Sequence, residues 1–224
     1  MIIFKSIKKL NKEVNFKASI GFVPTMGSLH KGHISLIKSS KKNCEKTLVS
    51  IFVNPSQFNK KKDFQKYPRN LKKDISILRK LKVDFVLIPT TRNIFNDNKI
   101  KKLKILSKDK VLCAKFRPGH FEGVLTVINE FLKKIKSKHI FLGEKDFQQI
   151  YLIKRFIKSR FRTKVFTCKT IRDQNYLPFS SRNNLLNKYD IKKASIVSKT
   201  LKKNYSLIKN SLRNKNKILE IKNY

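Results

Sequence analysis

Two histidines stand three residues apart in the segment Pro24-Thr-Met-Gly-Ser-Leu-His-Lys-Gly-His33. Residues with this spacing share one face of a helix, so His30 and His33 can point together at one ligand. The segment leads from a strand-like run into a helical one, and the N–H groups at a helix N-terminus attract phosphate. Gly27 and Gly32 allow a close approach of the backbone. A phosphate site is the favoured interpretation. A metal pair and two solvated histidines are the alternatives, and no third metal ligand stands at a suitable spacing.

A second segment, Ser50-Ile-Phe-Val-Asn-Pro-Ser-Gln-Phe58, carries no charged residue, although 30% of the chain is charged. Asn54 and Gln57 follow its strand-like part and offer neutral hydrogen-bonding groups, which suit a small polar substrate. The alternative is that Asn-Pro is an ordinary turn signal.

Three further segments combine glycines, charges and hydroxyls. RPGHFEGV at 117–124 is a loop bounded by glycines that enters a helical run. In GEKDFQQ at 143–149, Lys145 offers a cation for phosphate and Asp146 a carboxylate for ribose hydroxyls; a helix N-cap beside a solvated lysine is the alternative. SSRN at 180–183 has two hydroxyls and a guanidinium that suit a polyphosphate, or it is an ordinary capped loop.

The elements that must position these segments alternate along the chain. Apolar runs of strand length are found at 20–24, 47–53, 83–88, 139–142 and 164–168, and helical spacing is found at 34–42, 63–81, 123–135 and 147–157. Near-continuous apolar strands alternating with helices predict an α/β fold with a doubly wound, Rossmann-like parallel sheet. Ligands of such sheets bind beyond the carboxyl ends of the strands, where three of the segments begin.

Composition limits the class of protein. The 224 residues are 40% hydrophobic and include 17 Phe, which is enough for a packed core. No apolar run approaches the roughly 20 residues of a membrane-spanning helix. The opening MIIFKSIKKL has no signal-peptide character. The three cysteines show no CxxC spacing, which argues against a disulfide scaffold or zinc ribbon and predicts a reducing, cytoplasmic setting.

The charge is strongly positive. Lys and Arg number 54 against 14 Asp and Glu, for a net charge of +40, which raises the possibility of nucleic-acid binding. The excess lies outside the segments described above, which together are nearly neutral, and no nucleic-acid-binding motif is found. The excess of lysine is therefore interpreted mainly as compositional bias, with some steering of anions.

The five segments PTMGSLHKGH, SIFVNPSQF, RPGHFEGV, GEKDFQQ and SSRN, in this order, resemble the pantoate–β-alanine ligase family, from the first residues to about Leu186. Residues 30–33 resemble the HxGH signature of the adenylyl-transferring superfamily, and residues 180–183 its second, KMSKS-like signature. The resemblance implies ATP-dependent condensation of pantoate with β-alanine through pantoyl adenylate, with AMP and pyrophosphate released, in a cytoplasmic homodimer. The alternatives are a sibling HxGH nucleotidyltransferase, a basic nucleic-acid-binding protein, or an inactive remnant of the ligase.

The resemblance also implies roles for residues. His33 and His30 contact the phosphates, with His33 as proton donor, and Lys145 and Arg182 hold phosphate oxygens. The implied ATP-binding residues are Pro24, Thr25, Met26, Gly27, Ser28, Leu29, His30, Lys31, Gly32, His33, Gly143, Glu144, Lys145, Asp146, Ile171, Phe179, Ser180, Ser181 and Arg182. The implied residues for pantoate and β-alanine are Gln57, Gln149 and Asn54, and the implied metal residue is Asp74, for Mg²⁺.

The chain departs from the family pattern at several places. Phe179 and Ser56 stand where the family usually has Met, and Asn175-Tyr176 stands where it has Asp-Gly. Residues 1–178 are expected to form the Rossmann-like domain for ATP and pantoate. Residues 179–224 are expected to hold the SSRN motif and a reduced remnant of the C-terminal lid domain, since about 50 residues are needed for a domain.

Overall fold

The computed structural model describes residues 1–95 and 100–211 and divides into two compact units, Met1–Ile171 and Arg172–Tyr224. Among the described residues, no helix combines the length and the apolar character needed to cross a membrane.

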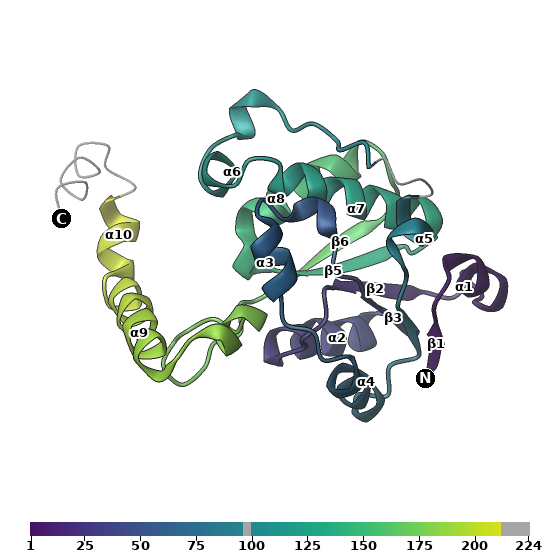
Figure 1. Ribbon diagram of the computed structural model, residues 1–224, viewed down its shortest axis with the longest axis horizontal. Coiled ribbons are helices and arrows are strands. Elements are labelled where there is room, and N and C mark those ends of the chain that lie inside the picture. The colour runs from purple at the N-terminus through teal and green to yellow at the C-terminus, as the bar shows by residue number, and fades with distance from the viewer. Residues whose placement is uncertain (96–99, 212–224) are drawn as a thin grey trace. The chain divides into compact units, whose positions relative to one another are not determined.

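The first unit contains one six-stranded sheet in which every neighbouring pair is parallel (Figure 1). The strand order is β1-β4-β3-β2-β5-β6. The strands are β1 (Ile2–Phe4), β2 (Ile20–Thr25), β3 (Lys46–Ile51), β4 (Phe85–Leu87), β5 (His139–Gly143) and β6 (Lys164–Cys168). The doubly wound, Rossmann-like parallel sheet predicted from the sequence is thereby confirmed. The three-residue edge strand β1 was not among the predicted strands, because so short a run carries no periodicity.

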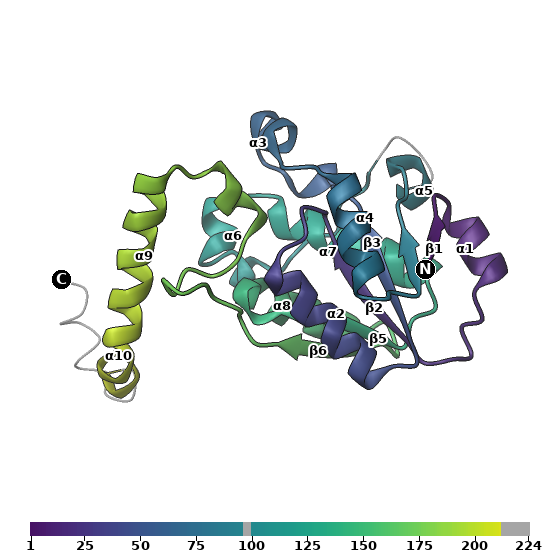
Figure 2. The ribbon, with the colours of Figure 1, turned by 90° about the horizontal axis from the view of Figure 1, so that it is seen from below.

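Helices connect the strands and cover both faces of the sheet (Figures 1 and 2). The helices of the first unit are α1 (Ile7–Glu13), α2 (Lys31–Asn43), α3 (Lys61–Lys66), α4 (Leu71–Lys80), α5 (Thr91–Phe95), α6 (Cys113–Phe116), α7 (His120–Lys134) and α8 (Phe147–Lys158). Single 3₁₀ turns are η1 (Pro55–Gln57), η2 (Ser107–Asp109) and η3 (Glu144–Asp146). The single helix predicted over 63–81 is wrong: Pro68 separates α3 from α4, since proline disfavours helical backbone in the residue before it.

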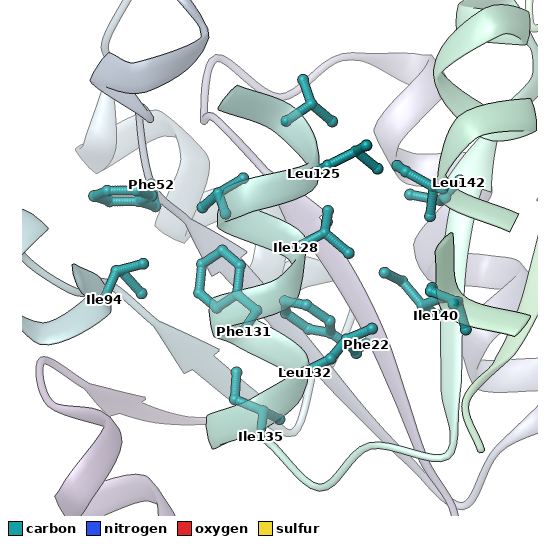
Figure 3. Close-up of a cluster of buried hydrophobic side chains, with 14 of the residues drawn as sticks. Phe22, Phe52, Ile94, Leu125, Ile128, Phe131, Leu132, Ile135, Ile140 and Leu142 are labelled. Atoms are coloured by element: carbon teal, nitrogen blue, oxygen red, sulfur yellow. The ribbon is translucent and has the colours of Figure 1, made fainter. Parts of the chain in front are cut away.

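The sheet is buried on both faces because its strand residues alternate between two hydrophobic clusters. Phe22, Leu48 and Ile140 face the hydrophobic cluster to which α7, α8 and α1 contribute. Figure 3 shows the side chains by which α7 packs against this face of the sheet: Leu125, Ile128, Phe131 and Leu132. The rings of Phe22 and Phe131 meet edge to face with centroids 5.3 Å apart. The next residues along the strands, Val23, Val49 and Phe141, face the cluster of α2 and α4. The near-continuous apolar runs of β2, β3 and β5 therefore reflect central strands that are covered on both faces of the sheet.

The second unit contains η4 (Ser181–Leu185), α9 (Lys188–Lys203) and α10 (Tyr205–Ser211). It begins with a tight turn in which Asp173 Oδ1 accepts hydrogen bonds from the backbone N–H groups of Asn175 and Leu177, at 2.8 and 3.0 Å. Tyr176 takes the left-handed conformation, with φ of 63°, and its ring lies against Lys202 of α9 at 3.6 Å from the ring centroid. Residues 212–224 of the predicted C-terminal segment lie outside the described residues.

Candidate active site at the carboxyl ends of the strands

Three of the segments singled out in the sequence begin where the direction of strand addition reverses. Strands β3 and β4 lie to one side of β2, and β5 and β6 lie to the other. Gly21 and Phe22 of β2 pair with His139 and Ile140 of β5, so the carboxyl ends of β2 and β5 are neighbours. The loop 26–30 follows β2, the turn 54–57 follows β3 and the turn η3 follows β5. This is the switch point at which doubly wound sheets bind ligands.

His30 and His33 form a reciprocal cap at the start of α2. His30 is the N-cap residue, and its Nδ1 accepts a hydrogen bond from the backbone N–H of Gly32 at 3.1 Å. His33 Nδ1 accepts in turn from the backbone N–H of His30 at 3.3 Å, and the ring centroids are 4.0 Å apart. Because both Nδ1 atoms are acceptors, a neutral ring carries its proton on Nε2. The cap therefore presents two Nε2–H donors side by side.

Burial keeps both rings neutral at pH 7. It lowers the pKa of His30 to about 4, with a further contribution from the charge of Lys145. Burial also lowers the pKa of His33 to about 3, assisted by His30 and Lys145. The charge of Lys145 acts on both rings, and Lys145 lies in η3, directly after β5, which is the neighbour of β2 in the sheet. Lys145 is thus a cation at the same end of the sheet as the two neutral histidines.

Asp74, in the first turn of α4, holds the loop that precedes the histidines. Its Oδ2 accepts from the backbone N–H of Ser28 at 2.8 Å, and its Oδ1 accepts from that of Leu29 at 2.7 Å. Burial raises the pKa of Asp74, and the hydrogen bonds from Leu29 and Ser28 oppose that shift. Within the described residues no group of three or more His, Cys, Asp or Glu side chains could hold a metal ion. The carboxylate is 2% exposed, so it leaves no room for the water shell that Mg²⁺ keeps, and Asp74 does not fit the predicted metal role.

Asn54 organises the turn that follows β3. It is 1% exposed, and its Oδ1 accepts from the backbone N–H and the hydroxyl of Ser56 at 3.2 and 2.8 Å. Its Nδ2 donates to Gln57 Oε1 at 3.0 Å and to the carbonyl of Gly123 at 3.1 Å. Every polar atom of the Asn54 side chain therefore has a protein partner. The contact with Gln57 fixes which way that amide points, since its oxygen must face Asn54 and its nitrogen then lies 3.2 Å from Met26 Sδ.

The RPGHFEGV segment forms the start of α7 and braces the same turn. His120 Nδ1 lies 2.7 Å from the carbonyl oxygen of Gln57. The Ser56 hydroxyl donates to the carbonyl of Gly123 at 3.3 Å. A Cβ on Gly123 would stand 2.3 Å from the carbonyl oxygen of Ser56, so only glycine permits this approach. The sequence singled out this segment without assigning a site residue to it; His120 and Gly123 hold the turn from behind.

The remaining predicted residues of the first unit lie around the same edge. Lys145 and Asp146 are neighbours in η3, with Nζ and Oδ1 3.8 Å apart. Gln149 is half-buried in the first turn of α8, directly after η3. The sequence-predicted residues that end β2 and β5 or follow β2, β3 and β5 thus lie at the carboxyl end of the sheet: Pro24, Thr25, Met26, Gly27, Ser28, Leu29, His30, Lys31, Gly32, His33, Asn54, Gln57, Gly143, Glu144, Lys145, Asp146 and Gln149.

Other predicted residues stand outside this group. Ile171 ends the first unit, and Phe179, Ser180, Ser181 and Arg182 belong to the second. Within the second unit, Ser180 caps η4 by accepting from the backbone N–H of Arg182 at 3.3 Å, and Ser181 is buried. The SSRN segment thus forms a capped turn within the second unit, and its predicted contact with ATP stays a prediction.

A six-stranded parallel sheet with an HxGH cap after β2 and a lysine turn after β5 defines an enzyme fold of the HxGH nucleotidyltransferase type. The family model described as pantoate–β-alanine ligase matches residues 2–223. The chain belongs to the pantoate–β-alanine ligase family, as the five sequence segments indicated.

Individual relatives agree with this membership. The chain is 44% identical over 220 residues to the pantothenate synthetase of Francisella philomiragia, covering 96% of this chain and 84% of that protein. The crystal structure of the pantoate–β-alanine ligase of Francisella tularensis, described as complexed with β-γ ATP and β-alanine, matches with a TM-score of 0.86 and 43% identity over 90% of this chain and 79% of that one. Pantothenate synthetase of Thermus thermophilus matches with a TM-score of 0.85 and 30% identity, covering 90% and 73% of the two chains. A sibling nucleotidyltransferase or a nucleic-acid-binding protein is not favoured.

Proposed function

We propose that this chain joins pantoate to β-alanine at the expense of ATP, through a pantoyl-adenylate intermediate. The observation that carries the proposal is the His30–His33 cap with Lys145 beside it, one strand away from the braced Gln57 turn. The reaction needs a region that binds phosphate, which the cap and Lys145 would provide, and a neutral polar region for pantoate, which the Gln57 turn would provide.

The first half-reaction brings two anions together. A carboxylate oxygen of pantoate attacks the α-phosphorus of ATP, the bond to the β-phosphate bridging oxygen breaks, and pyrophosphate leaves. Positioning and charge stabilisation, rather than covalent help, carry such a transfer. In our proposal Lys145 neutralises phosphate charge, and the Nε2–H groups of His30 and His33 donate to phosphate oxygens as charge develops. Phosphate binding would raise the pKa of His33, which supports its predicted role as proton donor.

The second half-reaction needs no further cofactor. The amine nitrogen of β-alanine attacks the acyl carbon, the bond between that carbon and the phosphate oxygen breaks, and AMP leaves with that oxygen. The proton that the nitrogen loses passes to solvent. Gln57 and Gln149 are proposed to hold the hydroxyls of pantoate in both steps. Neutral amides suit this task, because a cation there would tie up the carboxylate that must attack.

Other contacts extend the proposal along the nucleotide. The backbone of Pro24–Gly27, with Gly143 and Ile171, is proposed to surround the nucleotide, and Asp146 to bind the ribose hydroxyls. Ser181 and Arg182 of the second unit are proposed to bind phosphate oxygens, where the guanidinium suits a bidentate contact. We propose that Mg²⁺ enters with the phosphates of ATP, that the protein works in the cytoplasm, and that it is a homodimer.

The test is an assay with ATP, pantoate and β-alanine in which AMP, pyrophosphate and pantothenate are measured separately, beside calorimetric titration of ATP. Equal amounts of the three products are expected, and each omitted substrate should abolish pantothenate. Binding of ATP without release of AMP or pyrophosphate would reject the proposal. Pyrophosphate without pantothenate would reject the ligation step. Light scattering tests the dimer.

A further inference from the structure

We propose that Asp74 is a positioning residue for the adenylation step: its carboxylate holds the backbone of Gly27–Leu29 so that the His30–His33 cap faces the substrate. The inference rests on the proposed function in one respect, the role of the His30–His33 cap in binding phosphate. The structural part, a carboxylate that sets the arrangement of two histidines, can be tested without turnover.

The carboxylate makes two short hydrogen bonds to consecutive peptide groups, 2.8 Å to Ser28 and 2.7 Å to Leu29. Both peptides belong to a loop whose backbone is not self-supporting, because Gly27 and Ser28 take positive φ values of 78° and 50°. A non-glycine residue such as Ser28 adopts this conformation only where its surroundings impose it. Asp74 is the group that provides both acceptors.

The loop is held along its whole length. At its start, the Thr25 hydroxyl accepts from the backbone N–H of Gly27 at 3.2 Å and donates to the carbonyl of Ser50 on β3 at 2.7 Å. At its end, Leu29 is followed directly by His30, whose N–H is bound by His33. A displacement of Leu29 therefore moves the residue that caps α2 and the ring stacked on it.

Asp74 itself is fixed by α4. Asn70 caps this helix by accepting from the backbone N–H of Lys73 at 3.0 Å, and Leu78, one turn after Asp74, is fully buried against the sheet. The carboxylate is thus held by a packed helix that is distant in sequence from the loop. A side chain so fixed suits the positioning of a loop better than the binding of an exchanging ion.

The two acceptors must both be oxygens. An asparagine at this position would keep one acceptor and turn an NH₂ group toward a backbone N–H, leaving a buried donor unsatisfied. The geometry also separates this role from metal binding, since both carboxylate oxygens are engaged by the loop and the group is 2% exposed.

The experiment compares Asp74→Asn with the matched control Asp84→Asn. Asp84 Oδ2 also accepts from a backbone N–H, that of Thr47 at 2.9 Å, but at the amino end of the sheet. For D74N we expect pantoate-dependent exchange between pyrophosphate and ATP to fall by about 10²-fold at saturating ATP and pantoate, the scale of a lost oxyanion donor. The Mg²⁺ concentration for half-maximal rate should stay unchanged. D84N should stay within about twofold.

A second readout needs no activity. In nitrogen-detected NMR of the ligand-free protein, His30 and His33 should show Nδ1 as the unprotonated nitrogen, and D74N should move both pKa values upward from about 4 and about 3 toward 6.5. D84N should leave both unchanged. Unaltered histidine signals in folded D74N would overturn the inference, even if the protein proved to have another activity.

Two other outcomes also decide the matter. Full recovery of the D74N rate by excess Mg²⁺ would overturn the inference in favour of a metal ligand. If D74N does not fold, Gly27→Ala tests the same contact from the loop, because its Cβ would stand 3.0 Å from Asp74 Oδ2 at a φ that alanine resists. The same losses are then expected, and a normal exchange rate in G27A would overturn the inference.

Discussion

The loop after β2 and the turn after β3 follow neighbouring parallel strands, yet they are held by opposite means. The loop carries the His30–His33 cap; the buried carboxylate of Asp74 in α4 accepts hydrogen bonds from two of its backbone N–H groups, and the Thr25 hydroxyl accepts one from that of Gly27. The turn carries Gln57 and is fixed by amide, hydroxyl and carbonyl groups and by the close approach of Gly123. The loop therefore depends on a charged carboxylate, whereas the contacts given for the turn are made by amide, hydroxyl and backbone carbonyl groups.

This difference matches the ligands proposed for the two regions. A phosphate site needs donors that are aimed in advance, so a charged anchor behind the loop suits it. The turn is proposed to face pantoate, whose carboxylate must stay reactive, and neutral amide and hydroxyl groups suit that task. Each region can be perturbed separately, which gives four predictions in order of their expected effect on turnover.

The largest effect is expected from His33→Ala, which removes one of the two Nε2–H donors and one half of the cap. Formation of pantoyl adenylate should fall by about 10²-fold or more, measured as pantoate-dependent pyrophosphate release. His139→Ala is the control, because His139 lies at the amino end of β5, and its rate should be close to that of the parent. A near-normal rate for H33A would place the phosphate site elsewhere.

The next effect concerns the turn. Asn54→Asp keeps the shape of the side chain but cannot donate to Gln57 Oε1 or to the carbonyl of Gly123. A buried polar group without a partner costs about 1–3 kcal/mol. The KM for pantoate should therefore rise about tenfold or more, while the affinity for ATP stays unchanged. Asn43→Asp on the exposed end of α2 should change neither quantity. An equal loss of ATP affinity in N54D would mean that the two regions are not independent.

A smaller effect is expected from Gly123→Ala, because the new Cβ would force the α7 backbone away from Ser56. The free energy of unfolding should fall by about 1–3 kcal/mol, measured by urea denaturation. Gly143→Ala is the matched control for stability, since its Cβ would meet only Leu36 Cδ2 at 3.9 Å. A G123A protein as stable as the parent would show that Gly123 and the Ser56 carbonyl are not in close contact in solution.

The last prediction concerns stability rather than turnover, and it is a pH dependence to which the two histidines of the loop contribute. The folded-state pKa values of His30 and His33 lie below 6.5, so the unfolded chain binds protons first as the pH falls. The contribution of the two histidines to stability should therefore be complete above pH 6.5 and decline as the pH falls from 6.5 to about 3. Thermal unfolding from pH 7.5 to 4.5 should be less pH-dependent in the double variant His30→Gln, His33→Gln. Equal slopes for parent and variant would contradict the assignment, and N54D should keep the slope of the parent.

Much of this architecture was readable from the sequence. Five of the six strands are found within about two residues of their predicted bounds, because buried parallel strands are continuous apolar runs that end at Pro, Asn or Gly. The positions of the His30, Asn54 and Lys145 segments after these strands followed from the same pattern. Pro68 by itself predicts the break between α3 and α4. The helical spacing of apolar residues around it led to the prediction of one continuous helix.

What the sequence determined by itself was the alternation of elements, the family and the residue types that reach the edge of the sheet. Tertiary structure alone decided how those residues are held. Asp74 reaches Leu29 across 45 residues, and Asn54 reaches Gly123 across 69. Contacts between residues so far apart produce no periodic pattern in the sequence, because they depend on which helix packs beside the end of which strand. The sequence shows that a carboxylate, a glycine and an amide are present, and only the packing of α4 and α7 on the sheet makes them the supports of the site.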